Sequence, residues 1–361
     1  MYHEPDNPFD GRSLRPADVR SDLYAWRKLA DCASLPTQSD VFVAAMQQHL
    51  LQYLETCQLH VPAKGEPIAC IALCRSKGPI SPWRMSGDDE LFEPIDALIS
   101  GPDAAAQLAI EMTSLGRALD LGRAPANSPM VEALRRRMRG RGLFWLSDST
   151  PAPYLPLSAS WRAPLDNFSS RRRSDFRRAS RRADELGTVE FSMLAPSPGE
   201  FDALFDEAIA VEARSWKSAA GSAILCDPRK EAFFRRYLKA MSEKRQSRIA
   251  FMRIDGTPVA VQLAVTWDDR YWLYKIGFDE TYARCSPGSL LMLYVVGEAA
   301  RVGLRAVEFM GEAESWITDL WTKEQHEFVH VRAYPLAPAA IGALACDAVA
   351  WFAARLRGRK P

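Results

Sequence analysis

The chain has 361 residues, of which 47% are hydrophobic and 25% charged, and its net charge at neutral pH is +1. This length exceeds one ordinary domain and suits two, and the composition is that of a soluble globular protein. The near-zero charge excludes a global electrostatic attraction to nucleic acid or to membranes, although arginines cluster at Arg135–Arg141 and Arg171–Arg182.

The thiols and the N-terminus indicate the cellular compartment. Seven cysteines, an odd number, are scattered along the chain, which favours reduced thiols over a disulfide framework. Cys70 and Cys74 lack the second pair that a zinc site needs, and the five histidines form no ligand pattern, so we expect no metal. The polar first ten residues lack the apolar core of a signal peptide. We therefore expect a cytoplasmic protein with a flexible leader at residues 1–20.

Capping and turn signals predict alternating helices and strands in the N-terminal half. Ser39 is a good N-cap for a first helix, and Lys64-Gly65 marks a turn between two strands. Tyr154–Leu157 is bounded by prolines, which predicts an edge or crossover strand. The expected helices are Asp40–Leu54, Ala104–Leu115 and Pro129–Met138, and the other expected strands are Cys57–Val61, Pro67–Cys74, Leu119–Leu121 and Gly142–Leu146.

The C-terminal half repeats this order. Asp255-Gly256 predicts a tight hairpin between two of three successive antiparallel strands. The expected helices are Arg171–Leu186, Pro198–Trp216, Asp227–Met241 and Pro287–Val302, and the expected strands are Val189–Leu194, Arg248–Arg253, Pro258–Thr266, Tyr271–Phe278, Ala306–Met310 and Glu327–Tyr334. The repetition predicts two copies of one α/β unit, at residues 21–160 and 161–335, followed by an apolar helix with a basic tail at 336–361.

The sharpest local signal is Ser286-Pro287-Gly288-Ser289, which opens the helix after the strand Tyr271–Phe278. Serine is a preferred N-cap, proline suits the first helical position, and Gly288 lets a ligand approach the backbone. We expect the amides of Gly288, Ser289 and Leu290 to be unpaired donors suited to a pyrophosphate. The alternative is an ordinary capped helix without a ligand.

Several motifs follow one another in a set order. They are Ser215-Trp216-Lys217 with Gly221-Ser222, then Gly277-Phe278-Asp279, then Ser286–Leu290, then Glu308-Phe309-Met310-Gly311-Glu312 leading to Trp316 and Trp321. In this order they resemble the FemAB-like and CelD-like branch of the GNAT acyltransferases, whose members carry two tandem GNAT folds. The likeness covers roughly residues 160–334, and more loosely the N-terminal half.

The resemblance implies a mixed α/β fold in which acyl-CoA lies between two splayed strands, with its pyrophosphate at Ser286, Gly288, Ser289 and Leu290. In the N-terminal half, Ser100-Gly101-Pro102 also precedes a helix, but Asp103 follows at once. A carboxylate there would repel phosphate. We therefore expect the N-terminal copy to be degenerate and the C-terminal copy to be catalytic.

Acyl transfer to an amine needs a proton acceptor, oxyanion stabilisation and a proton for the departing thiolate. The backbone amides of Tyr271–Phe278 are candidates for binding the oxyanion. Each of the candidate side chains named next also has an ordinary structural explanation, such as a solvated carboxylate or a packed tyrosine ring. Candidate bases are Glu308, Glu312 and Asp279, candidate acids are Tyr274 and Tyr282, and candidate substrate-binding residues are Trp216, Lys217 and Trp316. Cys285, before the N-cap, is a further candidate nucleophile or a bystander thiol.

The predicted function is N-acyl transfer from acyl-CoA or acetyl-CoA to an amine of a cell-envelope precursor. The resemblance implies either an amino sugar of an exopolysaccharide or a sphingoid-type lipid amine, because GNAT-like bacterial ceramide synthases are related to this branch. The basic helix Arg171–Arg182 suits CoA phosphates, a tRNA acceptor stem or lipid headgroups, or is simply solvated. Alternatives are a FemAB-like aminoacyl-tRNA-dependent ligase and a non-catalytic partner in polysaccharide assembly.

The C-terminal segment Leu336–Ala354 is almost wholly apolar and precedes four basic residues, the last of them Lys360. Pro338, Gly342 and Asp347 argue against a membrane-spanning helix. The segment either packs on the protein or lies peripherally on an anionic membrane, at the inner face of the cell membrane. We expect no specific DNA binding.

Overall fold

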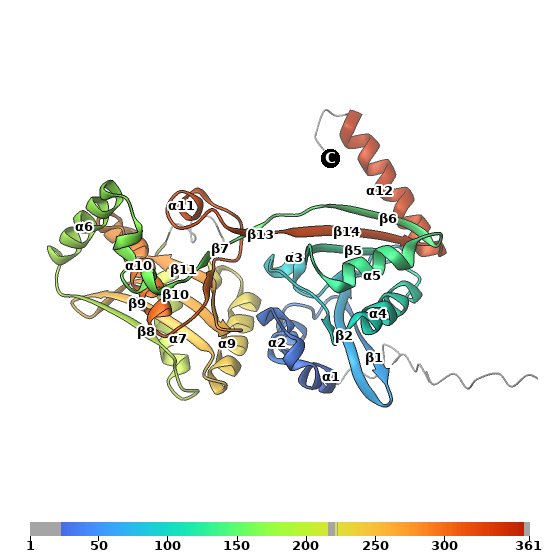
Figure 1. Ribbon diagram of the computed structural model, residues 1–361, viewed down its shortest axis with the longest axis horizontal. Helices are drawn as coiled ribbons and strands as arrows, with labels where there is room; N and C mark the ends of the chain where they lie inside the picture. The colour runs from blue at the N-terminus through green and yellow to red at the C-terminus, as the bar shows by residue number, and fades with distance from the viewer. Residues whose placement is uncertain (1–22, 216–220, 222, 357–361) are drawn as a thin grey trace, which may run out of the picture. The chain divides into compact units, whose positions relative to one another are not determined.

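The structure is a computed structural model that describes residues 23–215, 221 and 223–356, and it divides into two compact units (Figure 1). Unit 1 runs to Pro151 and resumes at Glu327, while unit 2 is the continuous segment Ala152–His326. The expected leader at 1–20 and the end of the basic tail lie outside the described residues. Within the described residues, no helix combines the length and hydropathy that crossing a bilayer requires.

Unit 1 is built on two small sheets with helices packed on them. One sheet has the order β1-β2-β3, with β4 also paired to β2, and the other has the order β5-β14-β6. Its strands are β1 (Glu55–Ala63), β2 (Glu66–Arg75), β3 (Arg84–Met85), β4 (Leu98–Ile99), β5 (Leu119–Pro125), β6 (Gly142–Asp148) and β14 (Phe328–Pro335). Its helices are α1 (Tyr24–Lys28), η1 (Ala30–Cys32), η2 (Pro36–Gln38), α2 (Asp40–His49), α3 (Asp88–Leu91), α4 (Pro102–Ser114), α5 (Pro129–Met138) and α12 (Pro338–Leu356).

The strand β14 corrects one expectation. The sequence order placed Glu327–Tyr334 as the last strand of the C-terminal unit, but β14 lies between β5 and β6 of unit 1 and is antiparallel to both. Its alternating Val329, Val331 and Ala333 are buried in the core of unit 1. An alternating pattern specifies which face of a strand is buried, but it does not specify the neighbouring strand.

Unit 2 contains one seven-stranded sheet in the order β13-β7-β12-β11-β10-β9-β8. Every neighbouring pair is antiparallel except β11 with β12. The strands are β7 (Ala152–Pro156), β8 (Val189–Leu194), β9 (Ser247–Ile254), β10 (Thr257–Trp267), β11 (Arg270–Phe278), β12 (Ala306–Glu308) and β13 (Gln325–His326). The helices are η3 (Ala159–Arg162), η4 (Pro164–Asn167), α6 (Ser170–Asp184), α7 (Phe201–Ala213), η5 (Ile224–Cys226), α9 (Pro228–Glu243), η6 (Glu280–Cys285), α10 (Pro287–Arg301) and α11 (Ser315–Thr318).

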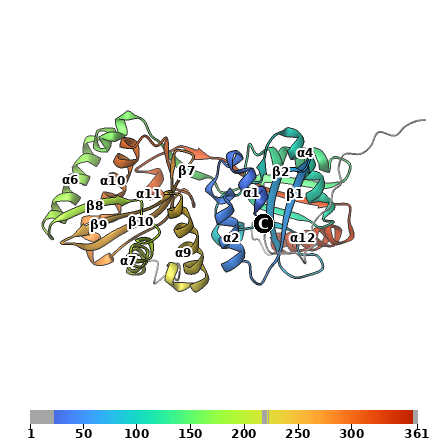
Figure 2. The same ribbon diagram turned by 90° about the horizontal axis from the view of Figure 1, so that it is seen from below.

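Helices cover both faces of this sheet, so unit 2 has three layers. Figure 2 shows α6 and α10 on one side of β8–β10 and α7 and α9 on the other. On the α10 side, apolar residues of α10 such as Leu291 and Val295 are buried against Val259 and Ala264 of β10. The strands β9 and β10 are nearly continuous buried runs because both their faces are covered.

Two expectations about the sheet of unit 2 can be compared with the strand pairing. Asp255 and Gly256, with φ of 48° and 76°, connect β9 to β10 as the sequence predicted, and β10 and β11 are antiparallel neighbours. The strand expected at Tyr154–Leu157, either at an edge or as a crossover, is β7, which lies inside the sheet between β12 and β13 and is therefore not an edge strand. Pro153 cannot donate a backbone hydrogen bond, but its carbonyl accepts one from the amide of Phe309 at 3.0 Å.

Gly277 sets how closely α7 approaches β11. A Cβ atom at Gly277 would lie 2.7 Å from the Cα atom of Glu212 in α7, so backbone would have to move. We expect Gly277→Ala to lower the free energy of unfolding by about 1–3 kcal/mol, as overpacking does, in urea titrations. Gly199→Ala is the matched control, because a Cβ there meets nothing within 4 Å. Equal stability of the two variants would contradict this account of Gly277.

Candidate active site

The site begins where β11 and β12 separate. The two strands pair only through Arg270–Trp272 and Ala306–Glu308, after which β12 ends and β11 continues to Phe278. The register between β10 and β11 also shifts, so that Leu263 pairs with Lys275, Ala264 pairs with Leu273, and Tyr274 is an extra residue. Such a bulge bends a strand and increases its twist. These features open one side of β11 next to the start of α10.

The turn into α10 differs from the expected N-cap. Ser286 has φ of 49°, in the left-handed region, and its side chain makes no cap hydrogen bond. Its carbonyl instead accepts hydrogen bonds from the amides of Ser289, at 3.0 Å, and Leu290, at 3.2 Å. Two of the three expected free donors are therefore used within the turn. The amide of Gly288 is the one of the three without an acceptor among the described residues.

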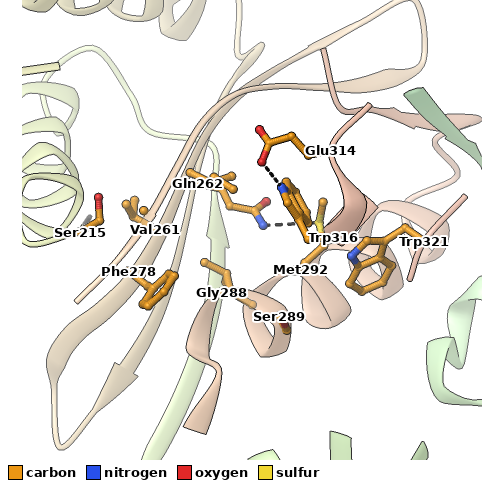
Figure 3. A pocket seen from close by; sticks show the side chains of 13 residues that line it. Ser215, Val261, Gln262, Phe278, Gly288, Ser289, Met292, Glu314, Trp316 and Trp321 are labelled. Atoms are coloured by element: carbon orange, nitrogen blue, oxygen red, sulfur yellow. Dashed lines mark hydrogen bonds between the residues drawn. The ribbon is translucent and has the colours of Figure 1, made fainter. Parts of the chain in front are cut away.

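A cavity of about 290 Å³ lies beside this turn. Most of its lining is apolar or aromatic, and the polar groups are few (Figure 3). The lining residues are Ser215, Val261, Gln262, Ile276, Gly277, Phe278, Gly288, Ser289, Leu291, Met292, Glu314, Trp316 and Trp321. A largely apolar pocket with a few convergent polar groups at a helix N-terminus is typical of a small-molecule site.

Two tryptophans form one wall of the cavity. The Trp316 indole donates from Nε1 to Oε2 of Glu314 at 2.9 Å, which ties the ring to the one carboxylate that the described residues contribute to the lining (Figure 3). Trp321 is 6% exposed, and its ring lies against Phe168 and Phe176 at centroid distances of 5.6 and 6.2 Å. This aromatic packing gives the cavity a rigid wall on the side away from the sheet.

The structure brings some of the predicted site residues to the cavity. Gly288, Ser289 and Trp316 line it, whereas Ser286 is exposed and Leu290 is buried in the core. Trp216 and Lys217 lie outside the described residues, so their predicted role in substrate binding stays a prediction.

Glu308 belongs to a buried ion-pair cluster and does not line the cavity. It is 2% exposed, and its two carboxylate oxygens bind Nη1 of Arg270 at 2.6 Å and Nε2 of His326 at 2.9 Å. The ring of Tyr154 stacks on His326, with centroids 4.1 Å apart. This cluster joins β7, β11, β12 and β13 at the closed end of the splay. Both oxygens of Glu308 are therefore used in structural contacts, which explains the presence of a buried carboxylate without a catalytic role.

The other predicted acid and base residues also lie outside the cavity lining. Tyr274 is buried beside α9, with its hydroxyl 3.1 Å from that of Tyr237, and Tyr282 is half-buried in the core. Glu312 is exposed. Cys285 is buried and its thiol donates to the carbonyl of Tyr282, and burial raises the pKa of the thiol instead of lowering it. A reactive Cys285 thiolate is therefore not supported.

Ser215, which belongs to a motif noted in the sequence, lines the cavity, as do two polar residues that sequence reasoning missed entirely. Gln262 interrupts the apolar run of β10, and that interruption was a usable signal. Glu314 follows the predicted acidic turn by two residues and shows no separate pattern. Among the described residues, no cluster of histidine, cysteine, aspartate or glutamate could hold a metal ion.

Comparison with known protein families gives a match within unit 2. Residues 170–316 match the family model of the acetyltransferase (GNAT) domain. No curated protein matches the chain significantly.

Solved structures resemble the chain over both units. The C-terminal domain (DUF2156) of a protein assigned as a lysylphosphatidylglycerol synthetase from Agrobacterium fabrum has a TM-score of 0.55 at 12% identity, covering 92% of this chain and 97% of that one. FemX has a TM-score of 0.55 at 10% identity, with 88% and 96% covered. A conserved protein of unknown function from Bacteroides thetaiotaomicron has a TM-score of 0.52 at 10% identity, with 89% and 98% covered.

At these identities the likeness concerns the fold. Within unit 2, residues 170–316 match the GNAT domain, and the chain shares its mixed α/β fold with these solved structures over both units. The match to the GNAT domain indicates an enzyme of the N-acyltransferase type.

Asp279 anchors the loop that leads into the α10 turn. Burial alone would raise the pKa of its carboxyl, but hydrogen bonds from Thr281 and Arg214 outweigh burial and hold that pKa below its ordinary value. The contact with Arg214, at 2.7 Å, ties this loop to the end of α7. The charged form of Asp279 is therefore the one that stabilises the fold.

The lowered pKa of Asp279 predicts that the stability of the fold depends on pH. A depressed folded-state pKa contributes stability above the unfolded-state value of about 4, and this contribution is lost as the pH falls through the folded-state value. Asp279→Asn should lower the free energy of unfolding by about 1 kcal/mol at pH 7, and the difference from wild type should shrink below about pH 4. Urea titrations across this range measure it, and Thr281→Val should follow the same trend. A difference that is constant with pH would contradict the assignment.

Proposed function

We propose that the protein transfers an acyl group from acyl-CoA to an amine of a cell-envelope precursor. The observation that carries the proposal is the apolar cavity that opens beside the amide of Gly288 at the start of α10. A pyrophosphate at this helix terminus would meet the positive end of the dipole. The acyl end of the donor would then enter the cavity between β11 and Trp316.

The proposed reaction assigns roles to groups around the cavity. The lone pair of a neutral amine attacks the thioester carbonyl carbon, the C–N bond forms, and the oxyanion is bound by backbone amides along the open side of β11. The C–S bond then breaks, and the CoA thiolate leaves and takes up a proton from water. Glu314, exposed at the rim of the cavity, accepts the proton that the amine loses. The products are an amide and free CoA.

The acceptor class is inferred from a structural neighbour. One structural neighbour is named for the synthesis of a lysyl phospholipid, which favours an envelope molecule. An amino sugar of an exopolysaccharide and a sphingoid-type lipid amine both offer the required primary amine.

The donor prediction is tested at Gly288. A Cβ there would lie 3.4 Å from Cδ1 of Phe278, so the fold should tolerate a side chain. Gly288→Glu places a negative charge where the pyrophosphate would approach, and we expect it to abolish CoA binding in calorimetry without lowering the melting temperature. Gly199→Glu is the control, because it adds the same charge at an open position of unit 2. Unchanged affinity of Gly288→Glu for CoA would contradict the proposed donor site.

The basic helix α6 supports a second candidate, a FemAB-like aminoacyl-tRNA-dependent ligase. Its exposed arginines are Arg171, Arg172, Arg177, Arg178, Arg181 and Arg182. Of these, Arg178 pairs with Asp175 at 3.6 Å and Arg182 donates to the carbonyl of Arg284. Such a face suits a phosphate backbone. Salt-sensitive binding of tRNA together with no binding of CoA would favour this candidate over acyl-CoA transfer, and binding of neither would favour the non-catalytic partner.

The helix α12 supports peripheral membrane contact. Ala340 and Ala343 are buried against Tyr334, but from Ala345 to Phe352 every residue is exposed. Val349, Trp351 and Phe352 are 69%, 40% and 62% exposed, and Arg355 lies 5.1 Å from the Trp351 ring centroid. An apolar helix that ends in basic residues fits the headgroup boundary of an anionic membrane.

Substituting Val349, Trp351 and Phe352 together with serine tests this contact while keeping the buried alanines. We expect the wild-type protein to sediment with anionic liposomes, less so at high salt, and the triple variant to remain in the supernatant. Neutral liposomes are the control for charge. Failure of the wild-type protein to sediment with anionic liposomes would remove the main reason for preferring a lipid acceptor.

A further inference from the structure

One polar side chain lies deep in the apolar cavity. Gln262 is on β10, between Val261 and Leu263, and it is 2% exposed. Its neighbours in the cavity lining include Ile276, Leu291 and Met292. An amide at such a position loses its hydration, so its presence calls for a hydrogen-bonding partner.

The orientation of this amide is set by Tyr271 on the adjacent strand. The Tyr271 hydroxyl donates to Oε1 of Gln262 at 3.3 Å, and the Tyr271 side chain is completely buried. Burial raises the pKa of the Tyr271 phenol, so the hydroxyl keeps its proton and remains a donor. With Oε1 engaged, Nε2 is the end of the amide that faces the cavity.

The nitrogen of Gln262 has only a weak acceptor in this structure. Among the described residues, its partner is Sδ of Met292 at 3.5 Å (Figure 3). A carboxamide nitrogen carries two donor hydrogens, and a thioether is a weak acceptor. A ligand oxygen at this point would give the amide a much better partner.

The size of the cavity limits the occupant. Its volume of about 290 Å³ is roughly twice the 150 Å³ of an apolar cavity that holds benzene, so the cavity is larger than an acetyl group requires. The reacting carbonyl must meet the amine near the rim, where Glu314 is exposed, whereas Gln262 is buried inside. The oxygen bound by Gln262 is therefore not the thioester oxygen.

We propose that Gln262 is a specificity-determining residue that selects a medium-length apolar acyl group carrying a hydroxyl or keto oxygen along its chain. This inference rests on the proposed acyl-CoA-dependent transfer. Tyr271 acts as a positioning residue, because it holds the amide with its nitrogen toward the acyl chain. An acyl group without the oxygen would leave the buried donor unsatisfied and would bind more weakly.

Calorimetry with matched ligands tests the proposal. The ligands are CoA, octanoyl-CoA and octanoyl-CoA hydroxylated at carbon 2, 3 or 4. For the wild-type protein we expect at least one hydroxylated form to bind about 10-fold more tightly than octanoyl-CoA. Gln262→Leu should abolish this preference while leaving the affinity for free CoA unchanged. Tyr271→Phe should reduce the preference without abolishing it, because the amide is then free to turn.

Each other outcome has a definite meaning. If no hydroxylated form is preferred, or if the preference survives in Gln262→Leu, the specificity role is overturned. If Gln262→Leu weakens octanoyl-CoA as much as the hydroxylated forms, the amide binds the common carbonyl and the specificity role is again overturned. If the wild-type protein binds no CoA compound, the proposed donor fails, and the same comparison with free octanoate and its hydroxylated forms decides the role of Gln262 separately.

Discussion

The short parallel pairing of β11 with β12 is the constraint on which the candidate site depends. Three residue pairs hold the strands together, and beyond them β12 ends while β11 continues. If the pairing extended further, a strand would fill the space where the cavity now lies. The buried Glu308, held by Arg270 and His326, fixes the closed end of this splay. A buried carboxylate with two cationic or hydrogen-bonding partners is costly to separate from them, so the opening starts at a defined point.

The bulge at Tyr274 and the left-handed conformation of Ser286 also shape the opening beside β11. The bulge shifts the register of β11 against β10, and the turn at Ser286 starts α10 beside the end of β11. The Ser286 carbonyl accepts hydrogen bonds from the amides of Ser289 and Leu290. Of the three amides, the one at Gly288 is therefore left for the proposed contact with an anion. The apolar interior and the turn that we propose for anion binding are thus produced by one strand and the residues that follow it.

Unit 1 consists of two segments of the chain, and unit 2 lies between them in the sequence. It leaves unit 1 after Pro151, forms all of unit 2, and returns at Glu327 to complete the sheet of unit 1 with β14. Without β14, the strands β5 and β6 would have no shared neighbour, and the core residues Val329, Val331 and Ala333 would be missing. Truncating the chain after Pro151 would therefore leave unit 1 incomplete, whereas unit 2 is one continuous segment.

The sequence by itself determined most of the longer helices and strands and indicated the class of the protein, whereas short elements such as β3, β4 and β13 were not expected. Local signals such as Asp255-Gly256 and the helix after Pro287 are read from neighbouring residues, and the ordered motifs around Gly288 and Trp316 located part of the cavity lining. Only the tertiary structure decided which acidic and polar groups face the cavity. Glu308 ends β12 and Glu314 lies six residues further on, but Glu308 is paired with Arg270 within the sheet whereas Glu314 lines the cavity. The placement of β14 and the inward amide of Gln262 likewise depend on contacts between residues distant in sequence, which a local pattern does not encode.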